Sequence, residues 1–280
     1  MGRLILNADD FGLTSGVNRA IVELHRAGAL TSATLMARAP AAEEAIRLAL
    51  STPSLGVGCH IVLADGEPVL PPSNLPTLVD PRTGRFQPTP GAFLRRLFTG
   101  SIRPGEIQSE AAAQIDLLQA RGLRLTHIDT HKHLHIFPAV LRPVLSAARA
   151  AGIRSVRNPF EPLWSLRATP AASPLRCAQL RLLRLFAPAF HRIVAEEGFT
   201  TTDGALGILA TGTLSTSIAS LLANLPAGTW ELVTHPGYND ADLARAHTRL
   251  LASREAERQA LRALQPIPNV DLISFADLRL

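Results

Sequence analysis

Short apolar runs alternate with helical stretches along the whole chain, and this alternation constrains the fold more than any other feature of the sequence. Eight runs are predicted to be strands: 3–8, 32–37, 56–62, 125–130, 155–157, 205–209, 230–234 and 271–275. Seven helices are predicted between them: 15–27, 41–50, 105–121, 139–151, 174–195, 215–224 and 241–264. Repeated strand–helix units favour a parallel sheet. They predict an α/β fold, a closed or distorted (β/α) barrel, with a doubly wound sheet as the alternative.

Two segments interrupt this alternation. Residues 65–104 are rich in proline and glycine and are predicted to form a long loop over one face of the protein. Residues 160–199 contain four prolines around a basic amphipathic helix. Neither segment has the composition of an interdomain linker, so we expect residues 1–280 to form a single domain with two insertions.

Composition excludes several classes of protein. The chain is 46% hydrophobic and 18% charged, which is typical of a folded domain rather than a disordered polymer. No apolar run reaches the roughly 20 residues of a membrane span, and the first residues lack the pattern of a secretory signal. Cys59 and Cys177 allow at most one disulfide. We therefore expect a soluble protein of the reducing cytoplasm.

The basic charge indicates little about nucleic acid. The net charge is +5, but the arginines are spread along predicted helices, Lys132 is the only lysine, and 5% of residues are aromatic. We expect no nucleic-acid partner because like-charge blocks and stacking platforms are both missing. The helix predicted at 174–195 has two interpretations: it packs on the barrel, or it lies on an anionic membrane as a peripheral contact at the inner face. A homodimer is left open.

Histidines concentrate in the sequence HIDTHKHLH. Its members His127, Asp129, His131, His133 and His135 recur with period two, which on an extended chain places all five side chains on one face. They cannot all bind one ion, because the first and last histidines would stand about 26 Å apart. We expect one or two to be metal ligands and the others to contact substrate or support the ligands. The alternative is a polar strand end with solvated histidines.

Four predicted strands each place an acidic or histidine side chain at their carboxyl ends, and one of them is the strand 125–130, which leads into the histidine segment. Asp9 and Asp10 close the first strand, where their mutual repulsion favours a bound cation or a shared proton, although a helix N-cap would also explain them. His60 closes the third strand, and a single histidine there can equally be a core residue. His235 closes the seventh strand before a Pro-Gly turn. Since such strand ends share one edge of a parallel sheet, these residues predict a site there.

Metal-assisted hydrolysis is the chemistry that this set favours. Two imidazoles and one carboxylate with open positions for water suit a catalytic metal, a second carboxylate can be the general base, and a further histidine the general acid. The sequence lacks a GxSxG elbow, a GxGxxG fingerprint and a P-loop. Two alternatives are a phosphoesterase on a similar barrel and a catalytically silent metal- or sugar-binding protein. A phosphoesterase usually carries an HxH pair on its first strand, and a silent protein would not need Asp9 beside a complete ligand set.

The ordered motifs NADDFG, SGVNRAI, TSATLMA, GVGCH, HIDTHKHLH and THPGY resemble the YdjC-like (ChbG-type) carbohydrate deacetylases over nearly the whole chain. The segments VLADGEPVLPP and VRNPFEP further resemble the hopanoid-biosynthesis-associated branch of that family. The resemblance implies a (β/α) barrel and metal-dependent removal of acetyl from an N-acetylated amino sugar. The hopanoid branch extends the expected substrates to a glycolipid.

The resemblance also implies roles for individual residues. Asp10, His60 and His131 are expected to bind one divalent metal ion, with Asp9 as general base and His235 as general acid. Thr130 replaces the serine usual in the family, and Lys132 stands where other members often carry His or Gln. Five residues are expected to contact substrate or support the ligands: Asp129, His127, His133, His135 and Arg157. The donor types favour Zn, Mn, Co or Ni over Mg, while the family leaves Mg open, so the ion is expected to be Mg or Zn.

Overall fold

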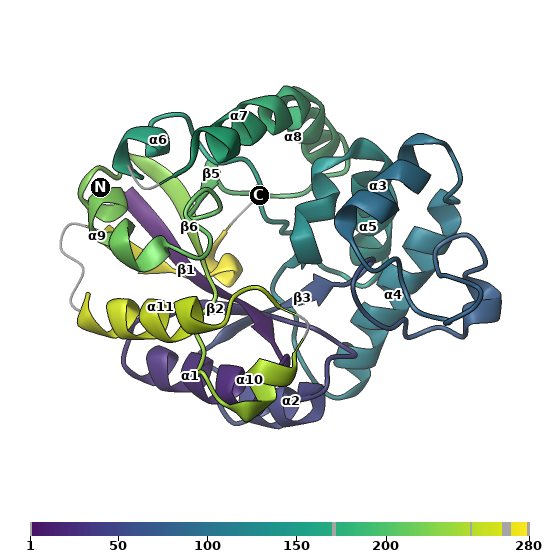
Figure 1. Ribbon diagram of the computed structural model, residues 1–280, viewed down its shortest axis with the longest axis horizontal. Helices are drawn as coiled ribbons and strands as arrows, with labels where there is room; N and C mark the ends of the chain where they lie inside the picture. Colours follow the sequence, from purple (N-terminus) through teal and green to yellow (C-terminus); the bar gives the residue numbers. More distant parts are fainter. Residues whose placement is uncertain (1, 170–171, 247, 265–269, 279–280) are drawn as a thin grey trace.

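The structure is a computed structural model that describes residues 2–169, 172–246, 248–264 and 270–278. Within these ranges seven strands form one parallel sheet: β1 Gly2–Phe11, β2 Ser32–Leu35, β3 Gly56–Ile61, β4 Ile128–Thr130, β5 Gly204–Leu206, β6 Gly228–Thr234 and β7 Val270–Ile273. The order across the sheet is β4-β3-β2-β1-β6-β5, and β7 pairs with β1. Helices surround these strands in a ring (Figure 1).

The edges of the sheet are joined by isolated bridges instead of a regular ladder. Ile128 in β4 bridges Val156, and Ser155 bridges Thr200, which lies shortly before β5. The arrangement is a distorted (β/α) barrel, so the predicted fold class is confirmed. The strand predicted at 155–157 is wrong, because this segment makes single bridges on its two sides and never forms a strand.

Strand β1 shares one of its edges between two neighbours. Its first half, from Gly2 to Ile5, pairs with β7, and its second half, from Asn7 to Phe11, pairs with β2. Strand β6 pairs along the other edge. Because side chains alternate across a strand, Ile5, Asn7 and Asp9 share the face opposite to Leu4, Leu6 and Ala8. The second set belongs to the large core cluster, whereas Ile5 packs in a separate small cluster with Ile273 and Phe275.

The longer helices cover the strands. They are α1 Ser15–Arg26, α2 Ala42–Leu50, α3 Pro90–Phe98, α4 Pro104–Ala120, α5 Pro138–Ala150, α7 Pro174–Leu183, α8 Ala187–Glu196 and α11 Ala252–Ala263. Shorter helices are α6 Ser165–Ala168, α9 Ile218–Ala223 and α10 Ala241–Arg245. Proline at the first turn begins several of them, since its missing N–H is unbonded there in any case. None of the helices described has the length and apolarity needed to cross a membrane.

Three predicted segments differ from the structure. The segment 65–104 is not loop throughout, because its end forms α3, which Thr89 caps by accepting a hydrogen bond from the Ala92 N–H. The helix predicted at 174–195 is divided by a 3₁₀ turn, Arg184–Phe186, and α8 then begins at Ala187 with Pro188 in its first turn. The helix predicted at 241–264 is two helices, since α10 ends at Arg245 and α11 begins at Ala252.

Candidate active site

A cavity of about 870 Å³ opens at the carboxyl ends of the strands. Six of the residues that line it were singled out from the sequence: Asp9, Asp10, His60, His131, His133 and His235. They come from the ends of β1, β3 and β6 and from the segment after β4. The structure therefore brings together the acidic and histidine side chains that were expected at this edge.

Both aspartates face this site because β1 is irregular at its end. The register between β1 and β2 shifts between Ala8 and Phe11, and Asp10 has a left-handed backbone with φ of 64°. In a regular strand Asp9 and Asp10 would point to opposite faces. Aspartate is among the few residues other than glycine that occupy this region at modest cost. The irregularity thus turns Asp10 towards the cavity mouth beside Asp9.

Asp10, His60 and His131 form a compact group of possible ligands. The His60 Nε2 and His131 Nδ1 atoms are 3.1 Å apart, and Asp10 Oδ1 lies 3.6 Å from the first and 3.5 Å from the second. Donors in a tetrahedral zinc site lie about 3.4 Å from one another, since each is about 2.1 Å from the ion. The donor types and their separations therefore fit one divalent ion.

His60 is oriented from behind by Asp129. The Asp129 Oδ1 atom lies 2.7 Å from His60 Nδ1, which leaves Nε2 facing the other two ligands. Burial alone would lower the pKa of His60, but the Asp129 and Asp9 carboxylates raise it to about 9. For Asp10, burial acts to raise the pKa, but Arg254 and His131 hold it well below its usual value. Asp10 is therefore ionised and available as a ligand.

The histidine-rich segment does not continue as a strand, so the prediction of five side chains on one face is wrong. Strand β4 ends at Thr130, and His131–Ile136 form a 3₁₀ segment in which Lys132 and His133 have left-handed backbones. His131 turns towards Asp10, and His133 lines the cavity. His135 turns back into the protein, where its ring nitrogens bond Thr130 Oγ1 and the Arg157 carbonyl.

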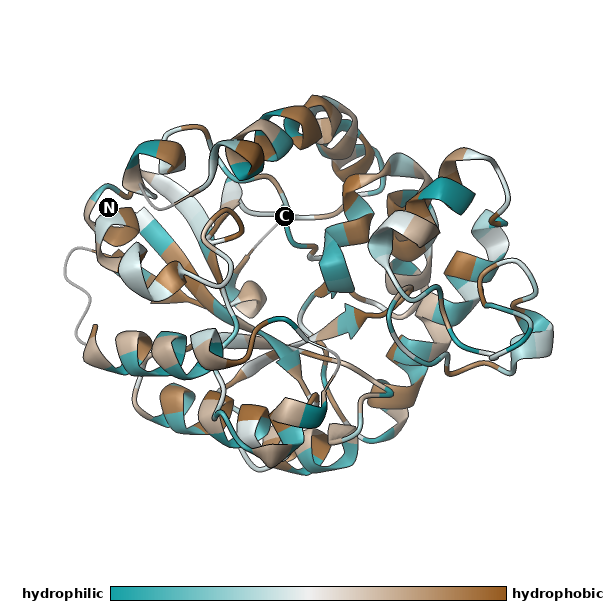
Figure 2. Ribbon diagram, in the orientation of Figure 1, coloured by the Kyte–Doolittle hydropathy of each residue, from teal (hydrophilic) through white to brown (hydrophobic). Residues whose placement is uncertain are grey.

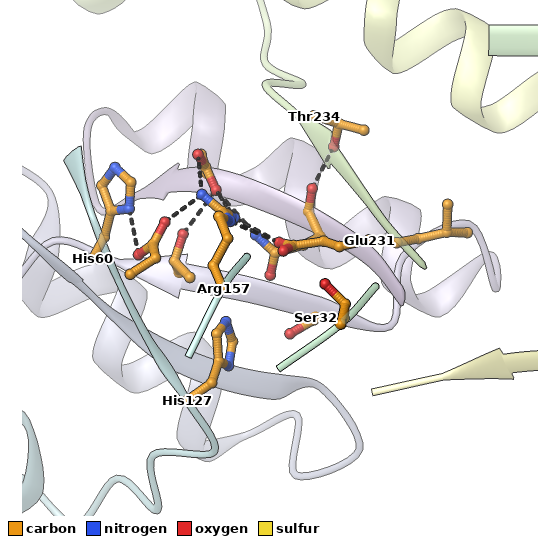
Figure 3. Close-up of polar contacts among 12 residues, drawn as sticks. Ser32, His60, His127, Arg157, Glu231 and Thr234 are labelled. Carbon is orange, nitrogen blue, oxygen red and sulfur yellow. Dashed lines mark hydrogen bonds and ion pairs between the residues drawn. The ribbon is translucent and has the colours of Figure 1, made fainter. Parts of the chain in front are cut away.

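His127 lies apart from the site, as Figure 3 shows. Its buried ring stacks on Phe275 at 3.7 Å between centroids, and its Nδ1 atom bonds Thr126 Oγ1. Gly58 is needed beside it, because a Cβ at that position would stand 2.4 Å from the ring. Burial lowers the pKa of His127 to about 3. These contacts make it a neutral core residue of the barrel.

Arg157 is fully buried beneath the site and bonds three carboxylates (Figure 3). It donates to Asp9 from both terminal nitrogens, at 2.9 and 2.6 Å, and forms a short ion pair with Asp129. Its Nε and Nη2 atoms contact Glu231 Oε1 at 2.9 and 2.7 Å. Arg157 thus holds the other carboxylates in place and is itself out of reach of the cavity.

The charges of this network are unequal, because one guanidinium serves three carboxylates. Burial opposes ionisation of Asp9 and Asp129, but Arg157 holds the pKa of both below the usual value. The ionised form of Glu231 is the least favoured, because burial raises its pKa to about 7 despite Arg157. Asp9 is therefore ionised at neutral pH, and Asn7 and Thr34 donate two further hydrogen bonds to it.

His235 faces Asp9 across the cavity floor. Its Nε2 atom lies 3.8 Å from Asp9 Oδ2. Burial lowers the pKa of His235 to about 4 even though Asp9 and Asp10 favour its protonated form. The imidazole is therefore neutral at pH 7 and can accept a proton from a neighbouring group.

The sequence did not reveal two residues of α11 that reach the site. Arg254 donates to Asp10 Oδ2 at 2.5 Å, and Glu257 accepts a 2.7 Å hydrogen bond from the His235 backbone N–H. They lie one turn apart on one face of a helix rich in Arg and Glu, and this composition predicts a solvent-exposed helix. Glu231 was missed as well, although a charged residue inside an apolar strand is a usable signal of a buried ion pair.

Comparisons with known proteins identify the family and several similar proteins. Residues 3–265 match the family model described as YdjC-like protein. A carbohydrate deacetylase of Geobacillus stearothermophilus is 36% identical over 241 residues, covering 86% of this chain and 81% of that protein. One from Brevibacillus brevis is 47% identical over 158 residues, covering 56% of this chain and 60% of that protein.

A solved structure supports the fold over the full length. The crystal structure of a putative cellobiose-phosphate cleavage protein from Enterococcus faecalis superposes with a TM-score of 0.75 at 24% identity, covering 100% of this chain and 99% of that one. With the family model spanning nearly all of the sequence, the chain belongs to the YdjC-like family.

Proposed function

We propose that this protein is a metal-dependent carbohydrate deacetylase that hydrolyses the acetamide of an N-acetylated amino sugar. One observation carries the proposal: the Asp10, His60 and His131 donor group lies in the same cavity as Asp9 and His235. The relatives described as carbohydrate deacetylases support the same reaction.

The ligand group is Asp10, His60 and His131 rather than Asp9, His60 and Asp129, which also lie close together. In that second set Arg157 bonds both oxygens of Asp9 and one of Asp129, and the other Asp129 oxygen bonds His60, so the carboxylate oxygens that a cation would need already have partners. A divalent ion held by the first group would polarise the amide carbonyl and acidify a water molecule. Zinc or magnesium remains the expected ion.

Asp9 is positioned to act as the general base. Its carboxylate is ionised and immobilised by Arg157, so it accepts a proton from the attacking water at a fixed point. Water adds to the carbonyl carbon, the C–N bond breaks, and the products are acetate and the free amino sugar. The leaving nitrogen needs a proton. His235 is neutral at rest, so it first receives the proton from Asp9 at 3.8 Å and then delivers it to this nitrogen.

The substrate that we propose is an amino sugar with an apolar aglycone, such as a hopanoid-linked N-acetylglucosamine. A side groove of about 260 Å³ joins the main cavity at Lys132, His133 and Arg176. Its wall includes apolar side chains: Ile136, Phe160, Leu180, Leu183, Ile208 and Leu209. The groove offers an aglycone a place beside the sugar site. A cytoplasmic location is proposed with it, supported by Cys59 and Cys177, which are both free thiols.

Acetate release tests the reaction. The purified protein is incubated with N-acetylglucosamine, N-acetylchitooligosaccharides and an alkyl N-acetylglucosaminide, with and without a chelator. We expect acetate from at least one amino sugar, loss on chelation and recovery on adding Zn²⁺ or Mg²⁺. Undiminished release in the chelator would contradict the metal, and a KM independent of the alkyl chain would contradict the aglycone groove.

Alanine variants test the ligand group. Asp10→Ala, His60→Ala and His131→Ala are each expected to lose bound metal and activity while keeping the circular dichroism spectrum of the wild type. His127→Ala is the matched control for losing an imidazole of the same segment, because its ring stacks on Phe275 and bonds Thr126, and neither of these lines the cavity. Near-normal metal content in any ligand variant would remove that residue from the group.

A further inference from the structure

The outer face of α7 carries exposed leucines that the barrel does not bury. Leu175, Leu182 and Leu185 are 69%, 63% and 72% exposed. They are three of the seven large hydrophobic residues found exposed across the described part of the chain, and they fall within 11 residues. Leu175 and Leu182 are two helical turns apart and share one stripe, which Leu185 widens. In Figure 2 hydrophobic residues extend over α7 and α8 at the top edge of the molecule.

The same region has a one-sided charge. From Pro162 to Ala195 the sequence contains five arginines and no aspartate or glutamate. The arginines are Arg167, Arg176, Arg181, Arg184 and Arg192. An apolar stripe within a purely basic segment matches a surface that is negative outside and apolar beneath.

The arginines of α7 and of the 3₁₀ turn after it have different hydrogen-bond partners. Arg176 donates to the Leu209 and Thr211 carbonyls, and Arg184 donates to the Glu161 carbonyl at 2.8 Å. These bonds fix the helix to the rim of the side groove. Arg181 lies on the exposed face beside Leu182 and makes no ion pair with any described residue. Arg176 and Arg184 therefore hold the helix in place, while Arg181 stays available at the surface.

We infer that the outer face of α7 and of the 3₁₀ turn that follows it, defined by Leu175, Arg181, Leu182 and Leu185, docks on an anionic lipid surface. Leucine side chains enter the acyl boundary, and Arg181 meets the lipid phosphates. Because the opposite side of α7, through Leu180 and Leu183, lines the side groove, docking places that groove about 10 Å from the bilayer, across the width of the helix.

A second copy of this chain fits the face less well. A two-fold contact centred on Arg181 would bring it against the same residues of the other copy, and between Pro162 and Ala195 these include arginines and no carboxylate, so like charges repel. An anionic bilayer supplies the opposite charge instead. Charge complementarity thus selects lipid as the occupant.

Sedimentation with vesicles tests the docking. The full chain is mixed with vesicles of phosphatidylcholine alone and of phosphatidylcholine and phosphatidylglycerol in equal amounts. We expect binding to the anionic vesicles only, weakened by added salt because the Debye length shortens. Arg181→Glu is expected to lower the partition coefficient about tenfold, since it reverses one charge at the surface. Leu182→Gln with Leu185→Gln is expected to lower it by about tenfold or more.

Matched controls lie elsewhere on the surface. Arg82→Glu and Leu50→Gln alter an equally exposed arginine and an exposed leucine away from α7 and should bind as the wild type does. Vesicle binding needs no turnover, so its outcome is independent of deacetylase activity. Absence of wild-type binding, or binding unchanged in the α7 variants, would overturn the inference. Sedimentation velocity that shows a dimer broken by the same variants, with no vesicle binding, would assign the face to a second copy.

Discussion

Two buried arginines hold the paired carboxylates of β1, and their surroundings differ. Arg157 binds Asp9 through two nitrogens and also contacts Asp129 and Glu231, so its donors are shared among three carboxylates. Arg254 reaches Asp10 from α11 with one 2.5 Å bond to Oδ2. Asp10 keeps its other oxygen directed at His60 and His131.

This difference explains how adjacent aspartates can serve different purposes. A carboxylate gripped on both oxygens by a guanidinium is a poor metal ligand, since the cation site is already filled. A carboxylate held on one oxygen is oriented and still has a lone pair for a metal. The pairing of each aspartate with its arginine, rather than the aspartates themselves, separates the proposed base from the proposed ligand.

Neutralising each aspartate in turn tests whether Asp9 and Asp10 have different roles. Asp9→Asn is expected to retain metal but lose about 10²- to 10⁴-fold in turnover, the usual range for removing a general base. Asp10→Asn is expected to lose metal first and activity as a consequence. Metal analysis and acetate release on the same preparations separate the two. Equal loss of metal in both variants would make Asp9 a ligand.

Removing Arg157 should damage the fold more than the chemistry alone requires. Arg157→Met leaves three buried carboxylates without their partner, which is expected to lower the free energy of unfolding by about 3–5 kcal/mol at pH 7. The wild type holds the pKa of Asp9 and Asp129 low, so their contribution is present above pH 4 and lost below it. The deficit of the variant should therefore be constant above pH 4 and shrink as the pH falls further, measured by urea unfolding.

Arg142→Met is the matched control, because this arginine also meets two carboxylates but is half exposed. Its loss should cost no more than about 1 kcal/mol. A similar cost for both variants would show that burial of the Arg157 network contributes nothing extra.

The sequence predicts the fold and the strand-borne half of the site well, for a physical reason. Alternating apolar runs encode parallel strands, and polar residues at their ends converge wherever the sheet curls. Asp9, His60 and His235 follow directly from this rule. Residues 155–157 were predicted as a strand, but they contain one apolar residue, Val156, and only Ser155 and Val156 make single bridges.

The remaining residues depend on local backbone and on tertiary contacts that spacing does not encode. The left-handed Lys132 and His133 divide the histidine segment, so period two predicted one face where the structure has several directions. Arg254 and Glu257 come from a helix whose charged composition is typical of a solvated surface, and only the packing of α11 against α1 and the 3₁₀ turn Leu214–Thr216 buries them. No pattern within α11 distinguishes these two from its exposed charges.

Glu257 extends the comparison to the second residue of α11 and predicts a pH effect. Burial raises its pKa to about 7 in the folded protein, well above the ordinary value of 4.5. Its contribution to stability is therefore full below pH 4.5 and is lost as the pH rises through 7. Glu257→Gln keeps the acceptor for the His235 N–H without the charge. We expect it to raise the free energy of unfolding at pH 8 by up to about 3 kcal/mol and to change nothing at pH 4.

Urea unfolding across that pH range measures the effect of Glu257→Gln. Glu255→Gln on the same helix is the control, because Arg258 lowers the pKa of Glu255 and its charge is favourable in the fold. That control should be slightly less stable than the wild type at pH 8. A destabilised Glu257→Gln at pH 8 would show that the charge of Glu257 stabilises the fold and would contradict the raised pKa.

The smallest effect is expected for the second arginine. Arg254→Lys keeps the positive charge near Asp10 but replaces the rigid guanidinium fork with a flexible ammonium. Because charge is conserved, any change in metal affinity reports the positioning of Asp10 rather than electrostatic repulsion of the ion. Loss of an outer partner of a ligand typically weakens metal binding, so we expect about a tenfold lower affinity in calorimetric titration with Zn²⁺.

Arg258→Lys on the same helix is the control for Arg254→Lys, since Arg258 pairs with Glu255 and Tyr238 away from the ligands. It should bind metal as the wild type does. If Arg254→Lys also binds metal unchanged, a charge near Asp10 suffices and the direction of its second oxygen does not matter. Arg254 would then differ from Arg157 only in the number of its partners. A weakened Arg254→Lys beside an unchanged Arg258→Lys instead means that α11 sets the geometry of the ligand, because only the fork fixes Oδ2 and thereby turns Oδ1 towards the two histidines.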